Sequence, residues 1–300
     1  MAKWAGCVLV LICSAAGIAR AEATADEGRA AIANLDWDTA IKYYQPLAAN
    51  AKVGTPEWTQ ATFCLAVAQQ QVQPASGDTI GTAEQLYRSI IDQSNDQRYV
   101  ARSLMNLGRI AELRDYTGDK IDLATARKFY AQVAEKYAND PIGSEAKLRE
   151  AAAFVMEYDA PDFKLARQGP PLLEKWLAEH PNDPLAAPMW QTAGDAYFMP
   201  LEDWKNALRC YEQVNRIGWV DPANSAPWFW RCARIAEKLG ENKTAVKYYT
   251  KIINEAPNSG KGYASVLALK RLGAPVPNNP LLADPATQPA AAPATQEARP

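Results

Sequence analysis

The 300-residue chain has one histidine and five cysteines, and these shortages exclude whole classes of active site. His180 precedes a Pro-Asn-Asp-Pro turn, so a catalytic triad, a His–Cys dyad or a histidine pair on a metal would depend on that single residue. No paired Cys or His has the spacing of metal ligands. We therefore expect no catalytic residue, no metal site and no cofactor, and the chain is predicted not to be an enzyme.

Phosphate-binding loops and an excess of positive charge are also lacking. The glycines within 77–81 and 260–262 have neither a preceding strand nor a following Lys-Ser or Lys-Thr. The formal charge is −2, so the composition gives no reason to expect a nucleic-acid partner.

No pair of acidic residues is ordered for glycoside chemistry, which requires two carboxylates about 5 to 10 Å apart in a cleft. Glu112, Asp115, Glu135 and Glu150 all fall in or beside helical patterns. We expect these side chains to occupy the solvent faces of helices.

The apolar run near the N-terminus, Trp4 to Ile18, has fifteen residues, whereas a membrane-spanning helix needs roughly 20. Lys3 precedes this run, and Ala19-Arg20-Ala21 follows it with small residues at the cleavage spacing. The pattern predicts that residues 1–21 are a signal peptide and that the mature chain begins at Glu22.

A retained membrane anchor and a lipid-modified cysteine are the alternatives to cleavage. Cys13 follows Ile12, a bulky residue where a lipoprotein signal has a small one, which disfavours lipid anchoring. We expect an exported protein, periplasmic or secreted, with no transmembrane span in the mature chain.

The mature chain would retain three cysteines, an odd number that forms no disulfide framework: Cys64, Cys210 and Cys232. Cys210 and Cys232 fall on consecutive helical patterns. Two interpretations remain open for this pair, a disulfide bridge or two small buried side chains.

A repeat is present along most of the chain. An alanine followed four residues later by a tyrosine, inside a helical pattern, recurs about every 40 residues, at Ala40/Tyr44, Ala83/Tyr87, Ala126/Tyr130, Ala207/Tyr211 and Ala245/Tyr249. A degenerate copy near Ala166 has Pro170 in the aromatic place. A period of roughly 40 residues is typical of a unit of two helices, and no segment alternates like a strand. The fold class predicted is all-α.

The five anchors lie on the second helix of each pair. The first helices are predicted between them, and a closing helix follows, at 57–71, 99–114, 144–157, 186–198, 226–239 and 261–272.

These positions resemble the tetratricopeptide repeat family. Its first helix has a Trp, a Leu-Gly and a Tyr, matched by Trp190, Ala193-Gly194 and Tyr197, and its second helix has the alanine and aromatic found at Ala207 and Tyr211. Phe229, Cys232-Ala233 and Ala236 begin another copy, and Leu107-Gly108 a partial one.

The resemblance implies a right-handed α-solenoid of about five to six helix pairs over residues 22–273. Residues 274–300 contain seven Pro and eight Ala without apolar periodicity, which predicts a disordered tail. This tail is either inert or binds a partner.

The export pattern and the irregular period also resemble periplasmic repeat proteins of the bacterial envelope, of the outer-membrane assembly or Tol-Pal associated type. The resemblance implies a non-enzymatic scaffold that binds a protein or peptide partner on its concave face. The alternative is an α-superhelical glycan-binding or carbohydrate-active envelope protein.

Four tryptophans outside the anchor places are the predicted partner-binding residues, because tryptophan is enriched at binding hot spots: Trp58, Trp219, Trp228 and Trp230. Trp228 and Trp230 point to different faces of one helix, so at most one of them can be core in the manner of Phe229.

Overall fold

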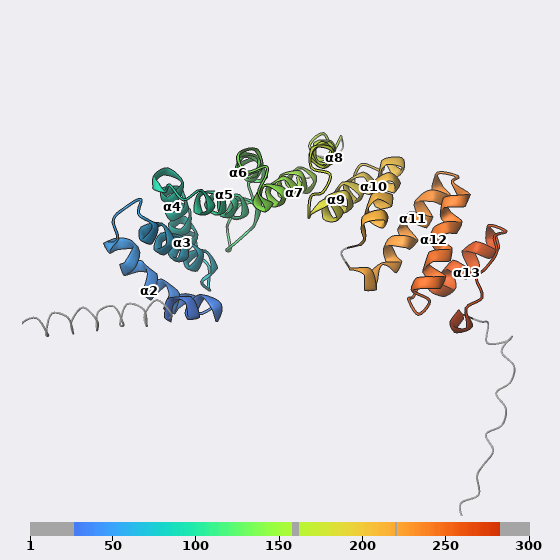
Figure 1. Cartoon of the computed structure of the whole chain (residues 1–300), viewed down its shortest axis with the longest axis horizontal. Helices are drawn as coiled ribbons and strands as arrows, with labels where there is room; N and C mark the ends of the chain where they lie inside the picture. Colours follow the sequence, from blue (N-terminus) through green and yellow to red (C-terminus); the bar gives the residue numbers. More distant parts are fainter. Residues whose placement is uncertain (1–26, 158–161, 220, 283–300) are drawn as a thin grey trace, which may run out of the picture. The chain divides into compact units, whose positions relative to one another are not determined.

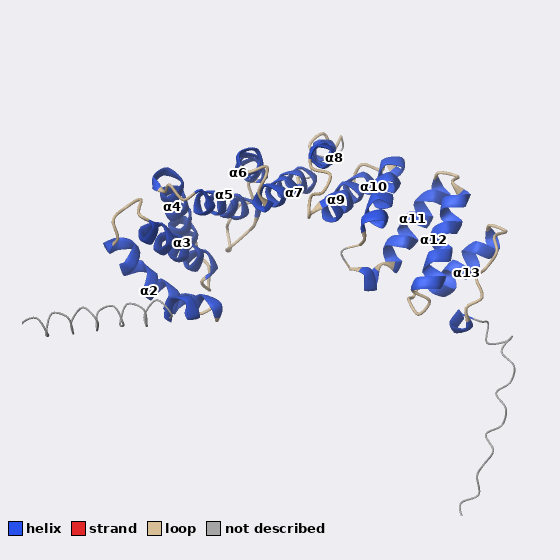
Figure 2. Cartoon of the chain, viewed as in Figure 1, coloured by secondary structure: helices blue, strands red, loops and turns tan. Residues whose placement is uncertain are grey.

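A computed structural model describes residues 27–157, 162–219 and 221–282. All regular structure in these ranges is helical, as Figure 2 shows, which confirms the predicted fold class. Residues 27–33 are helical and precede twelve further α-helices: α2 (Trp37–Asn50), α3 (Pro56–Gln71), α4 (Gly77–Gln93), α5 (Gln97–Glu112), α6 (Leu123–Lys136), α7 (Pro141–Met156), α8 (Gly169–Glu179), α9 (Ala186–Phe198), α10 (Trp204–Ile217), α11 (Ala226–Lys238), α12 (Asn242–Glu255) and α13 (Gly262–Arg271).

The chain divides into two compact units, residues 1–157 and 158–300. In the described part of the first unit, each helix from α2 to α7 packs against the next one, and α5 also contacts α3 and α7 (Figure 1). In the second unit, α8 to α13 pack in the same serial manner. Helix pairs stacked in chain order are the arrangement of an α-solenoid.

Short polar side chains start the helices. Seven N-cap residues accept a hydrogen bond from a backbone N–H of the first turn: Asp36, Thr55, Ser76, Asp96, Asp122, Asp140 and Asp203. Each such cap stabilises its helix by about 1 kcal/mol. Among the first helices, α3, α5 and α7 have such caps, and they begin within three residues of the predicted positions.

The repeated alanine–aromatic anchors form the contact between the helices of a pair. All five anchor alanines have no exposed surface, and the five tyrosines are at most 5% exposed. The Tyr130 ring lies directly over Gly108, and the Tyr211 ring over Gly194, so closely that a Cβ on either glycine would come within 3 Å of the ring. The small residue and the large ring therefore set the distance between the two backbones.

The end of the helical domain differs from the predicted boundary at Gly273. Ala274, Val276 and Leu282 pack against the core of the second unit, and the Asn279 side-chain amide donates a 2.8 Å hydrogen bond to the Ile253 carbonyl. The segment 274–282 therefore covers α12 and α13, because its few apolar side chains find a hydrophobic surface there. The rest of the predicted tail and the predicted signal peptide lie outside the described residues.

Among the described helices, none is both long and apolar enough to cross a lipid bilayer.

We predict opposite effects of one substitution at two glycines of the first unit. Gly108→Ala places a Cβ 2.5 Å from Cε1 of Tyr130, a fully buried ring that cannot move aside, and is expected to lower the free energy of unfolding by about 1–2 kcal/mol. Gly81→Ala meets no atom within 4 Å and should raise it by about 0.5–1 kcal/mol, because alanine is the better helix former.

Urea denaturation followed by circular dichroism measures both variants. Equal unfolding free energies for the two would contradict the role given to the Gly108–Tyr130 contact.

Candidate functional site

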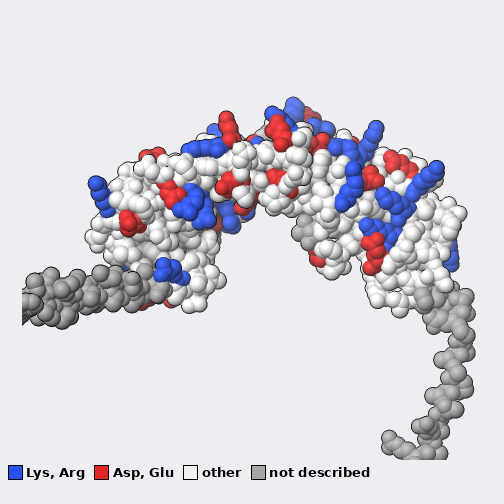
Figure 3. Space-filling model, in the orientation of Figure 1, with Lys and Arg blue, Asp and Glu red and all other residues white. Residues whose placement is uncertain are grey.

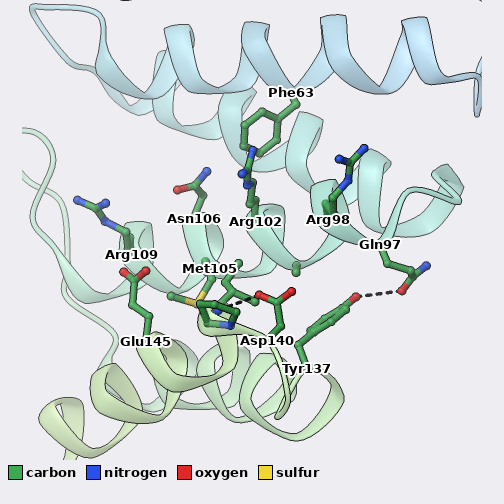
Figure 4. Close-up of a pocket in the computed structure, with 13 residues that line it drawn as sticks. Phe63, Gln97, Arg98, Arg102, Met105, Asn106, Arg109, Tyr137, Asp140 and Glu145 are labelled. Carbon is green, nitrogen blue, oxygen red and sulfur yellow. Dashed lines mark hydrogen bonds between the residues drawn. The ribbon is translucent and has the colours of Figure 1, made fainter. Parts of the chain in front are cut away.

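The first unit contains a groove of about 620 Å³ along its first helices. Phe63 of α3, seven residues of α5 and the start of α7 line this groove, and Tyr137 closes it at the end of α6. Figure 4 shows Arg98, Arg102, Asn106 and Arg109 in a row along α5, on the side of Phe63.

The register of α5 explains this row. Steps of four and seven residues bring Arg98, Arg102 and Arg109 to one face of a helix, while Met105 beneath them is only 6% exposed. Leu104, Leu107 and the other apolar residues of α5 occupy the opposite face, in the core. The amphipathic pattern of α5 therefore positions three guanidinium groups along the groove.

Polar groups on the opposite wall are already engaged. Tyr137 donates a 3.0 Å hydrogen bond to Oε1 of Gln97. Asp140 accepts from the Ile142 backbone N–H at 3.0 Å as the cap of α7, and Glu145 accepts from Nε of Arg149 at 2.9 Å. Both carboxylates keep their negative charge, but their hydrogen bonds are made within α7, to Ile142 and Arg149.

The three arginines differ in their partners. Arg98 pairs with Asp96, with 3.0 Å between Nη2 and Oδ2. Neither Arg102 nor Arg109 has an Asp or Glu oxygen within 4.0 Å in the part of the chain that the structure describes. Arg109 interacts with Asp115 only at longer range, through its positive charge. On the face shown in Figure 3, acidic and basic side chains are interspersed.

Other arginines of the chain pair with a carboxylate in a recurring group of three side chains, here called a junction. A junction consists of a hydrogen-bond acceptor on a first helix, the anchor tyrosine of the second helix and an arginine of the next first helix. Three junctions contain a carboxylate: Glu112–Tyr130–Arg149, Asp195–Tyr211–Arg231 and Glu237–Tyr249–Arg271.

Distances within these junctions are those of direct contacts. The Tyr211 hydroxyl donates to Oδ1 of Asp195 at 2.7 Å, and Nη1 of Arg231 lies 2.7 Å from the same oxygen. In the first unit, Glu112 accepts from the Tyr130 hydroxyl and lies 3.5 Å from Nη1 of Arg149. Each carboxylate therefore joins two helix pairs.

The corresponding contact between α3 and α4, beside the groove, has no carboxylate. There the Tyr87 hydroxyl donates to Oε1 of Gln70 at 2.9 Å, so the acceptor on α3 is an amide. Burial raises the pKa of Tyr87, whereas its hydrogen bond with Asn106 and the positive charge of Arg109 oppose this shift. Arg109 thus lies within electrostatic range of the junction but has no carboxylate there to pair with.

Burial also raises the pKa of Tyr130, and the adjacent Glu112 carboxylate raises it further. The phenol of Tyr130 therefore stays protonated as the donor.

Burial raises the pKa of the Cys210 and Cys232 thiols to about 12, so neither is a thiolate at neutral pH. Both cysteines have no exposed surface and are unbridged.

Two of the four predicted tryptophans do not present a ring to solvent. Trp58 is 6% exposed and Trp219 is 7% exposed, because each closes a helix boundary over the core. Their rings therefore contribute little to the surface, and partner binding by Trp58 and Trp219 stays a prediction.

Trp228 and Trp230 are both half-buried against the core of the second unit. Trp228 stacks on Trp219 at 5.3 Å between centroids, and the Arg231 guanidinium lies 4.6 Å from its ring centre. Trp230 meets Tyr249 edge-on, with the Lys261 ammonium 5.3 Å from its ring centre. Partner binding by either ring stays a prediction.

The expectation that the acidic residues lie on solvent faces is wrong for two of them. Glu112 is 7% exposed and Glu150 is 8% exposed, because Glu112 is a junction acceptor and Glu150 pairs with Lys147 at 2.6 Å. Glu135 is exposed, as predicted, and Asp115 is half-buried.

His180 stacks on Trp176, with 4.1 Å between ring centroids, and its Nδ1 lies 3.0 Å from the Trp176 carbonyl. It therefore ends α8 as a packing residue. No group of three or more His, Cys, Asp or Glu within the described ranges is placed to hold a metal ion.

Arg102, Arg109 and Gln70 are the site residues that the sequence analysis missed. Aligning the acceptor position of successive first helices would have found the signal: Gln70, Glu112 and Glu237 each stand four residues after the small residue beneath a tyrosine. Only the first of the three is an amide.

We predict that removing a junction hydroxyl destabilises the protein. Tyr130→Phe leaves the buried Glu112 carboxylate without its donor, and we expect a loss of about 1–3 kcal/mol in the free energy of unfolding. Tyr248→Phe is the matched control, since Tyr248 is equally buried and its hydroxyl faces only the Cys232 sulfur, a weak partner. Urea titration checks both, and equal losses would contradict the junction's role.

Comparison with known proteins gives a family model that matches part of the chain and solved structures of similar fold. The tetratricopeptide repeat model matches residues 229–259, which run from α11 through α12. Among solved structures, the chain is similar to PilF from Pseudomonas aeruginosa, with 17% identity and a TM-score of 0.48 over 81% of this chain and 95% of that one. No curated protein matches. The match at residues 229–259 confirms the predicted resemblance to the tetratricopeptide repeat family.

Proposed function

We propose that this chain is an exported, non-enzymatic scaffold of the cell envelope, and that the groove of its first unit holds a segment of a partner protein. The tetratricopeptide repeat supports a role in protein–protein interaction. The observation that carries the proposal is the open groove of about 620 Å³ where the first helices α3, α5 and α7 lie next to one another.

The lining of the groove suits an extended chain. Phe63, Met105 and Tyr137 provide apolar surface, while the side-chain amides of Gln97 and Asn106 offer both donors and acceptors to a peptide backbone. The groove is open along the helices, so a segment can lie across several repeats, as solenoids commonly bind their partners.

The carboxylates in the groove favour binding over catalysis. Asp140 is engaged as a helix cap and Glu145 in an ion pair, so neither is positioned to take a proton from a substrate. In the second unit, Glu174 and Asp195 are similarly held by Arg209 and Arg231, and no observation favours the glycan alternative.

Export and the envelope location rest on the pattern of residues 1–21, which lie outside the described residues. The short apolar run, its basic start and the small residues at 19–21 support removal of this segment and a periplasmic or secreted product.

Site-specific photo-crosslinking tests the groove. Benzoylphenylalanine in place of Arg98, an exposed lining residue of α5, is expected to capture a partner polypeptide in native cells. The same probe at Lys128, an exposed residue of α6 that does not line the groove, serves as the control. Identical adducts from both positions, or none from Arg98, would overturn the groove as the binding surface.

Cleavage of the signal has a separate test. Protein isolated from the envelope fraction of native cells should give Glu22 as its first residue on N-terminal sequencing. A chain that still begins with the apolar run, or a lipid-modified cysteine found by mass spectrometry, would contradict export in the proposed form.

A further inference from the structure

We propose that the segment held in the groove is acidic, and that two of its carboxylates pair with Arg102 and Arg109. This inference rests on the proposed function, since it names the chemistry of the partner that the groove would bind.

Charge within the groove gives the first argument. Asp96 neutralises Arg98, and the lining carboxylates of Asp140 and Glu145 are engaged elsewhere. Arg102 and Arg109 are left as exposed guanidinium groups over a lining that includes the largely buried Met105. A planar guanidinium binds a carboxylate through two parallel hydrogen bonds, which makes an acidic side chain the best complement.

The junctions give a second, independent argument. At three junctions a carboxylate on one first helix holds an arginine of the next: Arg149, Arg231 and Arg271. At the junction beside the groove the acceptor is Gln70, so α3 offers α5 no charge. The carboxylate missing from this position is the group that a bound partner would supply.

Helix geometry predicts the spacing of the acidic residues. Arg102 and Arg109 are seven positions apart on α5, which corresponds to about 10 Å at roughly 1.5 Å per residue. An extended polyproline II segment rises about 3.1 Å per residue and repeats its face every three residues. Two acidic residues three positions apart therefore match the two arginines.

A dense polyanion fits less well. Asp140 and Glu145 also line the groove and would repel a ligand that is charged at every position. The whole chain has a formal charge of −2, so no general positive field draws nucleic acid to it. A protein segment with spaced acidic side chains meets less repulsion from Asp140 and Glu145, and its binding does not require a positive field over the whole chain.

Selection from a random twelve-residue peptide display library on the purified protein tests the inference. We expect enriched peptides to contain Asp or Glu pairs three positions apart. Enriched peptides that bind the groove without acidic residues would overturn the acidic partner and leave the proposed function standing. Failure to enrich any peptide would count against both.

Fluorescence anisotropy of an enriched, labelled peptide then assigns the arginines. Arg102→Gln and Arg109→Gln should each weaken binding about tenfold, as expected for the loss of a charge-assisted hydrogen-bonded pair. Arg88→Gln is the control, because Arg88 is exposed on α4 and does not line the groove. An unchanged affinity in Arg102→Gln and Arg109→Gln would overturn the proposal.

Gln70→Glu provides a test that adds no bulk. The new carboxylate reproduces the charge of Glu112 and Glu237 at their junctions and should compete for Arg109, weakening the peptide severalfold while the protein stays folded by circular dichroism. Unchanged binding in this variant, or displacement of the peptide by equimolar inorganic phosphate, would contradict recognition of a spaced carboxylate segment.

Discussion

The structure depends on one contact: the ring of an anchor tyrosine lying on a small residue of the facing helix. Gly108 under Tyr130 and Gly194 under Tyr211 allow the two backbones to approach until the ring fills the space between them. The phenol hydroxyl then ends in the interior, where an unpaired polar group costs about 1–3 kcal/mol. Close packing therefore favours a second feature, an acceptor on the first helix for the buried hydroxyl, as at Tyr87, Tyr130, Tyr211 and Tyr249.

The choice of acceptor links packing to function. A carboxylate, as in Glu112, Asp195 and Glu237, satisfies the hydroxyl but is itself partly desolvated, and it gains an arginine from the next repeat. The amide of Gln70 satisfies Tyr87 without needing a cation. Because Gln70 is uncharged, α3 offers Arg109 no carboxylate at this junction, and the proposed recognition of an acidic segment rests on that difference.

Much of the fold was predictable from the sequence because packing residues recur at fixed positions. The alanine–aromatic anchors located the helices to within a few residues. The residues that match the family pattern are packing residues, with Gly194 against Tyr211 and Tyr197 bonded to Glu174. The site was not predictable in the same way. The burial of Glu112, for example, depends on Tyr130, which lies 18 residues away in the sequence, and helical periodicity does not report such contacts. Likewise, composition suggested a tail from residue 274 and gave no sign that 274–282 would cover the last helices.

A double-mutant cycle between Gln70→Glu and Arg109→Gln, measured on peptide affinity, tests most directly the claim that an uncharged junction creates the binding site. If the introduced carboxylate acts by occupying Arg109, its effect on affinity should disappear in the Arg109→Gln background, giving a coupling free energy close to the effect of Gln70→Glu alone. Additive effects of the two substitutions would show that junction and groove are independent, and would contradict the account.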